Sequence, residues 1–224
     1  MAKDRLIRGM NLVRRDLGSL LFHWTRSQFR RESESIIDSS WVKEPAGNIL
    51  FKILREGFLK GSSGFIRGNH QCVCFTEAPI SEVAALFKLA SYMRENDRPR
   101  YEPYGIAVRK EWLFSQGGRP VIYQSDAEYE NLSEELKWRH ARYEPNNGID
   151  FTWEREWRIR TSSLTLDPKH TLVVVPTVDE AFCIMYENSV LEAIDWDESS
   201  PSGVYHKPRW LSVSLDFFGV GNAL

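Results

Sequence analysis

Cysteine is scarce in this chain, and its spacing excludes the common cysteine-based sites. The three cysteines are Cys72, Cys74 and Cys183, and no two of them have the Cys-x-x-Cys spacing of a zinc ribbon or a redox motif. Cys72 and Cys74 alternate within an apolar run, so their side chains are expected on one face of a strand. We therefore predict three reduced, largely buried thiols, as is usual in a reducing compartment.

Several other signatures are missing as well. The N-terminus lacks the apolar core of a secretory signal, and no apolar run is long enough to cross a bilayer. The five histidines show no i, i+4 pair and no facial-triad spacing with carboxylates, so no metal site is expected. Gly-x-Ser-x-Gly, Walker and Gly-x-Gly-x-x-Gly motifs are absent. These absences predict a soluble, cytoplasmic protein with no membrane partner.

Neither sign of charge is in excess over the whole chain, but the basic residues are unevenly placed. The net charge is −2, with 42% hydrophobic residues, which is typical of a globular protein. Between Met1 and Arg31, however, eight lysines and arginines face only two aspartates. Two interpretations stay open: the solvated face of an amphipathic helix over residues 4–17, or a patch that binds phosphate or an acidic partner.

Short helices and strands are expected to alternate irregularly, without a linker or a repeat. Strands are expected at 19–25, 71–76, 104–109, 120–123, 151–160, 171–175 and 210–213. Helices are expected at 4–17, 48–56 (ended by Gly57), 81–92, 126–142 and 189–194. The strand at 171–175 is expected beside the one at 151–160. This order predicts one compact α+β domain over residues 1–224, with small antiparallel or mixed sheets flanked by helices and a C-terminal extension at 180–224.

The segment 151–160, FTWEREWRIR, carries the most informative pattern. As a strand it would place Glu154, Glu156 and Arg158 on one face, and Trp153 and Trp157 on the other. Two carboxylates on one face repel each other unless an arginine or a substrate compensates them. The segment is therefore either a surface strand with Glu–Arg ladders, or a strand that presents Glu156, the more central carboxylate, to a cleft.

His23-Trp24-Thr25 ends an early strand and is a second candidate for binding. A histidine beside a threonine at a strand end can hydrogen-bond a ribose or a phosphate. The alternative is a histidine with a structural hydrogen bond at the edge of the core. Gly61-Ser62-Ser63-Gly64 is a weaker signal and is interpreted as a flexible loop.

The order of these segments resembles the ADP-ribosyltransferase fold. In that fold a His-x-Thr strand, an Ile-Leu-x-x-Gly helix end and a late glutamate recur in this order, as at His23–Thr25, Ile53–Gly57 and Glu154–Glu156. CVCFTEAPI at 72–80, the segment at 104–123 and EREWR at 154–158 are similar to the bacterial abortive-infection family AbiGi. The resemblance covers roughly residues 20–176. No clear Ser-Thr-Ser strand is present, so the arginine-modifying subclass fits poorly.

The resemblance implies a role for individual residues around NAD. His23 would hold the adenosine-side ribose, and Thr25 would support the histidine or the nicotinamide pocket. Tyr92 would stack on nicotinamide, with Phe87 and Tyr104 as further candidates. Glu156 would stabilise the ribose as nicotinamide departs, and Glu154 would orient or activate the acceptor. We therefore expect His23, Tyr92 and Glu156 around a pocket between two small sheets.

The function implied by this resemblance is NAD-dependent ADP-ribosyl transfer. Such a protein would be a toxin-like effector of phage defence that modifies a nucleic acid or a protein. Members of the abortive-infection family have also been described as antitoxins. A non-catalytic partner on the same fold, which binds a toxin or a phage component through the basic N-terminal face, is therefore a second interpretation. An NAD glycohydrolase, which uses the same site without an acceptor, is a third.

Overall fold

The computed structural model describes residues 18–31, 41–64, 66–91, 101–187, 189–194 and 203–219. The expected helix at 4–17 and Tyr92 lie outside these residues. The chain divides into two compact units, each made of three segments. The first unit takes residues 1–23, 59–83 and 108–164, and the second takes 24–58, 84–107 and 165–224. The expectation of one domain over residues 1–224 stays a prediction.

The first unit is built on a four-stranded antiparallel arrangement, in the order β1-β5-β10-β7. Phe22 of β1 lies opposite Thr76 of β5, and Thr76 lies opposite Glu156 of β10. Val73 and Phe75 contribute to the buried core. The strands are β1 (Leu20–Trp24), β5 (Cys72–Thr76), β7 (Arg119–Pro120) and β10 (Glu156–Arg160). The expected strands at 19–25 and 71–76 are confirmed.

Short elements fill the rest of the first unit, and the long helix expected at 126–142 is wrong. A capping box between Ser125 and Glu128 starts a helix, but it ends after four residues. Leu136, expected on the apolar face of that helix, is 37% exposed and so buries little apolar surface to stabilise a longer helix. The elements are α4 (Lys110–Ser115), β8 (Ile122–Gln124), α5 (Asp126–Tyr129), η1 (Lys137–Arg139), β9 (His140–Arg142), η2 (Pro145–Asn147), η3 (Thr152–Glu154) and β11 (Ser163–Thr165).

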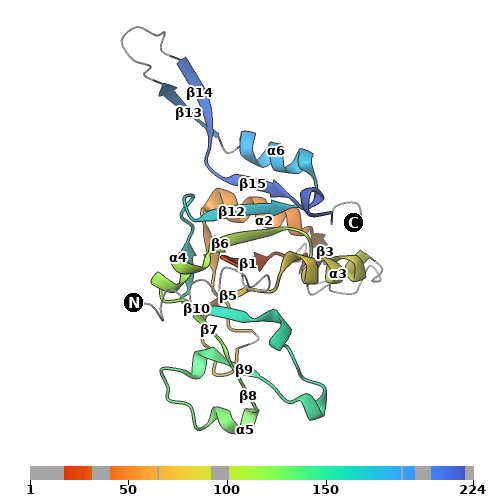
Figure 1. Ribbon diagram of the computed structural model, residues 1–224, viewed down its shortest axis with the longest axis vertical. Helices are drawn as coiled ribbons and strands as arrows, with labels where there is room; N and C mark the ends of the chain where they lie inside the picture. The colour runs from red at the N-terminus through yellow and green to blue at the C-terminus, as the bar shows by residue number, and fades with distance from the viewer. Residues whose placement is uncertain are drawn as a thin grey trace, which may run out of the picture. The chain divides into compact units, whose positions relative to one another are not determined.

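The second unit contains strands in the order β15-β12-β6, with helix α6 against β12 and β15 (Figure 1). The strands are β6 (Gly105–Arg109), β12 (Thr171–Val175) and β15 (Leu211–Ser214), and α6 is Val178–Glu187. β12 runs parallel to β15. The expected pairing of 171–175 beside 151–160 is therefore wrong. Val173, Val174 and Val175 are buried, as is usual for a strand with neighbours on both sides.

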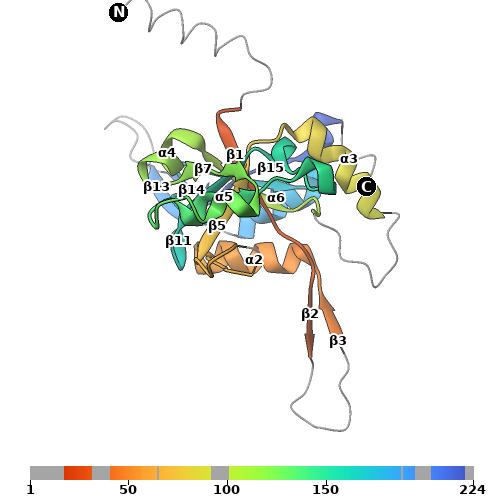
Figure 2. The same ribbon diagram turned by 90° about the horizontal axis from the view of Figure 1, so that it is seen from below.

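Two hairpins and two further helices complete the second unit. Figure 2 shows the hairpin of β2 (Gln28–Arg31) and β3 (Trp41–Glu44) leading into helix α2 (Ala46–Glu56). Gly57 ends α2 in a left-handed conformation with φ of 78°, as the sequence predicts. Three elements remain. Two of them cross the boundaries between segments, β4 (Phe58–Lys60) and α3 (Ile80–Ser91), and the third is the short 3-10 helix η4 (Leu215–Phe218).

The helix expected at 189–194 is wrong, because these residues form strand β13 (Ser189–Ile194). It pairs antiparallel with β14 (Gly203–Pro208) along its whole length (Figure 1). The partner strand supplies backbone hydrogen bonds that the sequence of 189–194 alone does not predict. Strands and helices of both units make the protein a mixed α+β fold, as expected. No helix in the described ranges is long and apolar enough to span a bilayer.

Candidate functional site

Glu156 begins strand β10 and is held by an arginine of the same strand. Its side chain points to the same face as Arg158, two residues further on, because side chains alternate along a strand. Nε of Arg158 lies 2.7 Å from Oε1 of Glu156, and Nη2 lies 3.0 Å from Oε2. The Arg158 side chain is 6% exposed and that of Glu156 17%. The shared face is as predicted, and part of the Glu156 side chain stays open to solvent.

Arg158 also ties the pair to a neighbouring part of the chain. Its Nη1 donates to the carbonyl oxygen of His140 at 2.7 Å and to that of Trp138 at 3.1 Å. The remaining guanidinium nitrogens hold Glu156. The orientation of the carboxylate is therefore fixed both by its own strand and by η1 and β9.

Glu154 does not share that strand, and this corrects the expectation of one strand over 151–160. It ends the 3-10 turn η3, and Arg155 after it adopts a left-handed backbone with φ of 46°. The Thr76 hydroxyl donates to the Glu154 carbonyl oxygen, so the chain bends onto the end of β5. The bend breaks the alternation that would have placed the two glutamates side by side. Glu154 is 5% exposed and presents little surface to an acceptor.

Two groups near Glu156, the Cys74 thiol and the Tyr123 hydroxyl, are neutral. Burial, followed by the negative charge of Glu156, raises the pKa of the Cys74 thiol on β5. The Glu156 amide donates to the Tyr123 hydroxyl at 2.9 Å. Burial raises the pKa of Tyr123 to about 12. Both groups are therefore protonated at neutral pH, and Arg158 is the cation that compensates Glu156.

His23 lies on the opposite face of the sheet from Glu156. Phe22, Thr76 and Glu156 form one row across β1, β5 and β10, and His23 is one residue along from Phe22. Its ring contacts Phe75 edge-on at 5.8 Å. Its Nδ1 donates to the Cys74 carbonyl oxygen at 2.8 Å, and burial lowers its pKa. The structure therefore does not bring His23 and Glu156 to one pocket, and the histidine has a structural hydrogen bond.

Thr25 and Tyr104, the other predicted cofactor-binding residues, are brought together in the second unit. The Thr25 hydroxyl is within hydrogen-bond distance of the carbonyl oxygens of Tyr104 (2.9 Å) and Ala46 (3.2 Å), and Thr25 is 4% exposed. The Tyr104 hydroxyl donates to Glu180 at 2.7 Å. Burial is the main cause that raises the pKa of Tyr104. These contacts join the residue after β1 to the start of α2 and to the residue before β6, and they join that residue to the start of α6.

The aromatic residue expected to stack on nicotinamide is not identified by the structure. Tyr92 lies outside the described residues. Phe87 is 1% exposed and packs edge-on against Trp24 with ring centroids 5.0 Å apart, so its faces are not open to a ligand.

An open pocket of about 260 Å³ lies at the start of β1 and at the turn into α3. Phe22 lines this pocket and belongs to the same row as Glu156. At about 4.8 Å per strand, two strand spacings put the Cα atoms of Phe22 and Glu156 roughly 10 Å apart. The pocket is therefore near the carboxylate along the sheet, although Glu156 does not line it.

Glu77 is a buried carboxylate at this pocket that the sequence pattern did not single out. It is 8% exposed and pairs with Lys110, with Oε1 2.5 Å from Nζ. Its Oε2 accepts a hydrogen bond from Trp157 Nε1 at 2.9 Å. The pairing of buried carboxylate, lysine and indole joins the end of β5 to α4 and β10. Nothing in the spacing of these three residues along the chain would have connected them.

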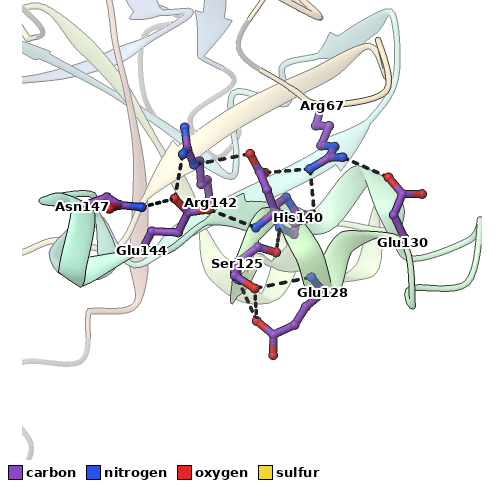
Figure 3. A network of polar contacts seen from close by, with 9 residues as sticks. Arg67, Ser125, Glu128, Glu130, His140, Arg142, Glu144 and Asn147 are labelled. Atoms are coloured by element: carbon purple, nitrogen blue, oxygen red, sulfur yellow. Dashed lines mark hydrogen bonds and ion pairs between the residues drawn. The ribbon is translucent and has the colours of Figure 1, made fainter.

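A further polar network joins β9 to Arg67 and α5 (Figure 3). Arg67 pairs with Asp126 and with Glu130, each at 2.9 Å. Arg142 pairs with Glu144 at 2.6 Å, and hydrogen bonds from Arg142 and then Asn147 lower the pKa of Glu144 to about 2. Each carboxylate named here has an arginine partner. The network therefore stabilises this part of the first unit and has no unsatisfied acid that would point to catalysis.

The prediction that all three cysteines are largely buried is wrong for Cys183. All three are free, and Cys72 is 2% exposed, but Cys183 on α6 is exposed rather than buried. Helix α6 turns this thiol away from its buried side, which carries Ala181 and Ile184. Among the described residues, no three histidine, cysteine or acidic side chains are grouped as metal ligands.

Comparison of the chain with protein-family models, curated proteins and solved structures finds no match.

Proposed function

We propose that this protein transfers ADP-ribose from NAD and that Glu156 is its catalytic carboxylate, in a toxin-like effector of phage defence. The supporting observation is Glu156, a carboxylate held in place by Arg158 on a partly exposed side chain, in one row with Thr76 and with Phe22 of the pocket. The residue resemblance at His23–Thr25, Ile53–Gly57 and Glu154–Glu156 supplies the identity of the reaction.

The chemistry of the proposed step requires a carboxylate that is charged and held in place. The bond between nicotinamide and ribose C1′ breaks, the bonding electrons leave with nicotinamide, and the ribose becomes oxocarbenium-like. A carboxylate stabilises this positive charge. A nucleophile of the acceptor, on a nucleic acid or a protein, then forms a bond to C1′ and loses a proton. With water as the nucleophile the same site would act as an NAD glycohydrolase.

Arg158 does not prevent this use of Glu156. Each carboxylate oxygen has two acceptor positions, and the guanidinium takes one on each. Two acceptor positions are then left, and a ribose hydroxyl could use either. In this proposal Glu156 acts on the ribose, whereas His23 and Glu154 support the structure.

A second candidate function, a non-catalytic binding partner such as an antitoxin, is favoured by a specific observation. Both oxygens of Glu156 are already bound by Arg158, so the pair is complete without a substrate. His23 and Thr25 likewise have structural partners. In this candidate Glu156 contributes to stability alone.

Nicotinamide release from NAD separates the two candidates. The purified protein is incubated with NAD and a cell extract as the source of acceptor, and released nicotinamide is quantified. We expect Glu156→Gln to lower nicotinamide release about 10²-fold or more, because it removes the negative charge that stabilises the oxocarbenium-like transition state. NAD binding should change much less. The control is Glu111→Gln, which removes one exposed carboxylate from the same unit. No release by the wild type, or equal release by both variants, would contradict the transferase proposal.

A further inference from the structure

Arg119 and Arg139 are two partly buried arginines without an acidic partner among the residues that the structure describes. Arg119 lies on β7, and Arg139 ends η1. No carboxylate in the described part of the chain forms an ion pair with either of them, whereas Arg67, Arg142 and Arg158 all have such partners. An uncompensated, partly buried guanidinium is costly, and two of them near each other are more costly still.

The two arginines are fixed through hydrogen bonds to the same short stretch of backbone, residues 114–120. Nη1 of Arg119 donates to the carbonyl oxygens of Gly118 (2.7 Å) and Phe114 (2.9 Å). Nε of Arg139 donates to the carbonyl oxygen of Pro120, the next residue, at 2.9 Å. Burial, and then the positive charge of Arg119, lower the pKa of Arg139. Arg139 is therefore anchored at β7, the strand that carries Arg119.

The arginines keep hydrogen-bond donors for a ligand. Nη1 makes both bonds of Arg119 and Nε makes the bond of Arg139, so Nη2 of Arg119 and both Nη groups of Arg139 have no acceptor among the described residues. β7 is the last strand in the order β1-β5-β10-β7, so a ligand can approach from the edge of the first unit's sheet. Two fixed guanidiniums with free donors are suited to the oxygens of a phosphate.

Phe114 adds an aromatic surface to this pair. The Arg119 guanidinium lies over its ring at 4.0 Å from the centroid, and Phe114 is 51% exposed. Arginines beside an exposed aromatic ring are the combination that binds nucleotides and single strands, through phosphate contacts and base stacking.

We propose that Arg119 and Arg139 form a binding site for a nucleotide phosphate at the edge strand β7. Arg119 lies opposite Arg158 in the β7–β10 pair, so the site is on the same face as Glu156. The phosphate belongs either to a dinucleotide such as NAD or to a nucleic-acid strand. The site is tested by binding alone, so its failure and the failure of the proposed transferase activity are distinguishable.

The test measures binding of NAD and of a fluorescent oligouridylate to the full chain at low salt, with inorganic pyrophosphate as competitor. We expect Arg119→Gln and Arg139→Gln each to weaken binding of either NAD or the oligouridylate about tenfold. This is the loss in affinity expected when one charge-assisted hydrogen bond is removed. Arg160→Gln is the matched control, since it removes the same charge from an exposed position on β10. Loss of oligouridylate binding assigns the site to a nucleic-acid strand, and loss of NAD binding assigns it to the dinucleotide.

Salt dependence and folding provide the remaining controls. If a strand is the ligand, the slope of log affinity against log salt should fall by about one for each arginine removed. Urea unfolding of each variant shows whether weaker binding reflects unfolding, and Arg139→Lys, which keeps the charge, should retain part of the affinity. The proposal is overturned if neither ligand binds the wild type, or if the Arg119 and Arg139 variants bind as tightly as Arg160→Gln.

Discussion

Arg158 binds both carboxylate oxygens of Glu156, the residue two positions before it on the same strand, at 2.7 and 3.0 Å. Both side chains are largely withdrawn from water, and Arg158 also donates to two backbone carbonyl oxygens. Its removal should therefore affect stability as well as any activity of Glu156.

A double-mutant cycle should show strong coupling between these two residues. Glu156→Gln leaves a buried guanidinium without its anion, and Arg158→Gln leaves a carboxylate without its cation, so each should destabilise the protein by about 3 kcal/mol. The double variant should be more stable than the sum predicts, by about 1–3 kcal/mol. Urea unfolding of the four proteins gives the coupling energy. Additive losses would show that the two side chains act independently.

Gly61 is required by a close backbone approach, whereas Gly64 in the same loop is not. A Cβ at position 61 would lie 2.0 Å from the Thr161 carbonyl oxygen, and one at position 64 would meet nothing within 4 Å. Gly61→Ala should therefore lower the free energy of unfolding by about 3 kcal/mol. Gly64→Ala, the matched control, should change it by less than about 1 kcal/mol. Equal effects in urea unfolding would contradict the close approach between these segments.

His23 should make the protein less stable as the pH falls below about 6.5. Burial lowers its folded-state pKa, so below the ordinary value of 6.5 the unfolded chain binds a proton that the folded chain does not. Stability should therefore fall by up to about 1.4 kcal/mol per pH unit until the folded pKa is reached. His23→Asn, which keeps a donor for the Cys74 carbonyl oxygen, should remove this dependence.

The measurement is the free energy of unfolding in urea at about pH 7.5 and about pH 5.5. His170→Asn, at a partly exposed histidine, is the control. A wild type and His23→Asn with the same change in stability between these pH values would show that His23 is not the group responsible.

Glu144 should contribute stability that is lost only in strong acid. Hydrogen bonds from Arg142 and Asn147 lower its folded-state pKa from 4.5 to about 2. Its contribution is therefore complete above pH 4.5 and disappears as the pH falls toward 2. Glu144→Gln should be destabilised at neutral pH, and the difference from the wild type should shrink through this interval. Thermal unfolding across the interval measures it, and a difference that does not vary with pH would exclude the ionised pair.

Local patterns were enough to predict the elements that depend on local contacts. Gly57 ends α2 because only a left-handed residue closes that helix end, and an apolar run marks β5. The side-by-side arrangement of Glu156 and Arg158 follows from the period of the strand. In each case the decisive interaction is between residues close together in sequence.

Several of the incorrect predictions involve partners that are distant in sequence. Strand β13 forms through pairing with β14. Strand β12 pairs with β15, which follows it by about 40 residues in the chain. Arg155 interrupts the expected strand because the Glu154 carbonyl is bonded to Thr76 on β5. The position of Arg139 beside β7 could not be predicted either, because it depends on the hydrogen bond from Arg139 to the Pro120 carbonyl oxygen.

The three-segment composition of each unit has a consequence for synthesis. The first unit is complete once residue 164 has left the ribosome, whereas the second still lacks the whole of 165–224. Strand β10, which joins β5 to β7, is also among the last parts of the first unit to emerge. Residues 24–58 and 84–107 of the nascent chain therefore remain without their packing partners until 165–224 has been synthesised. During that interval buried residues such as Leu50 and Leu54 of α2 would be exposed, which makes this helix a binding target for chaperones during translation.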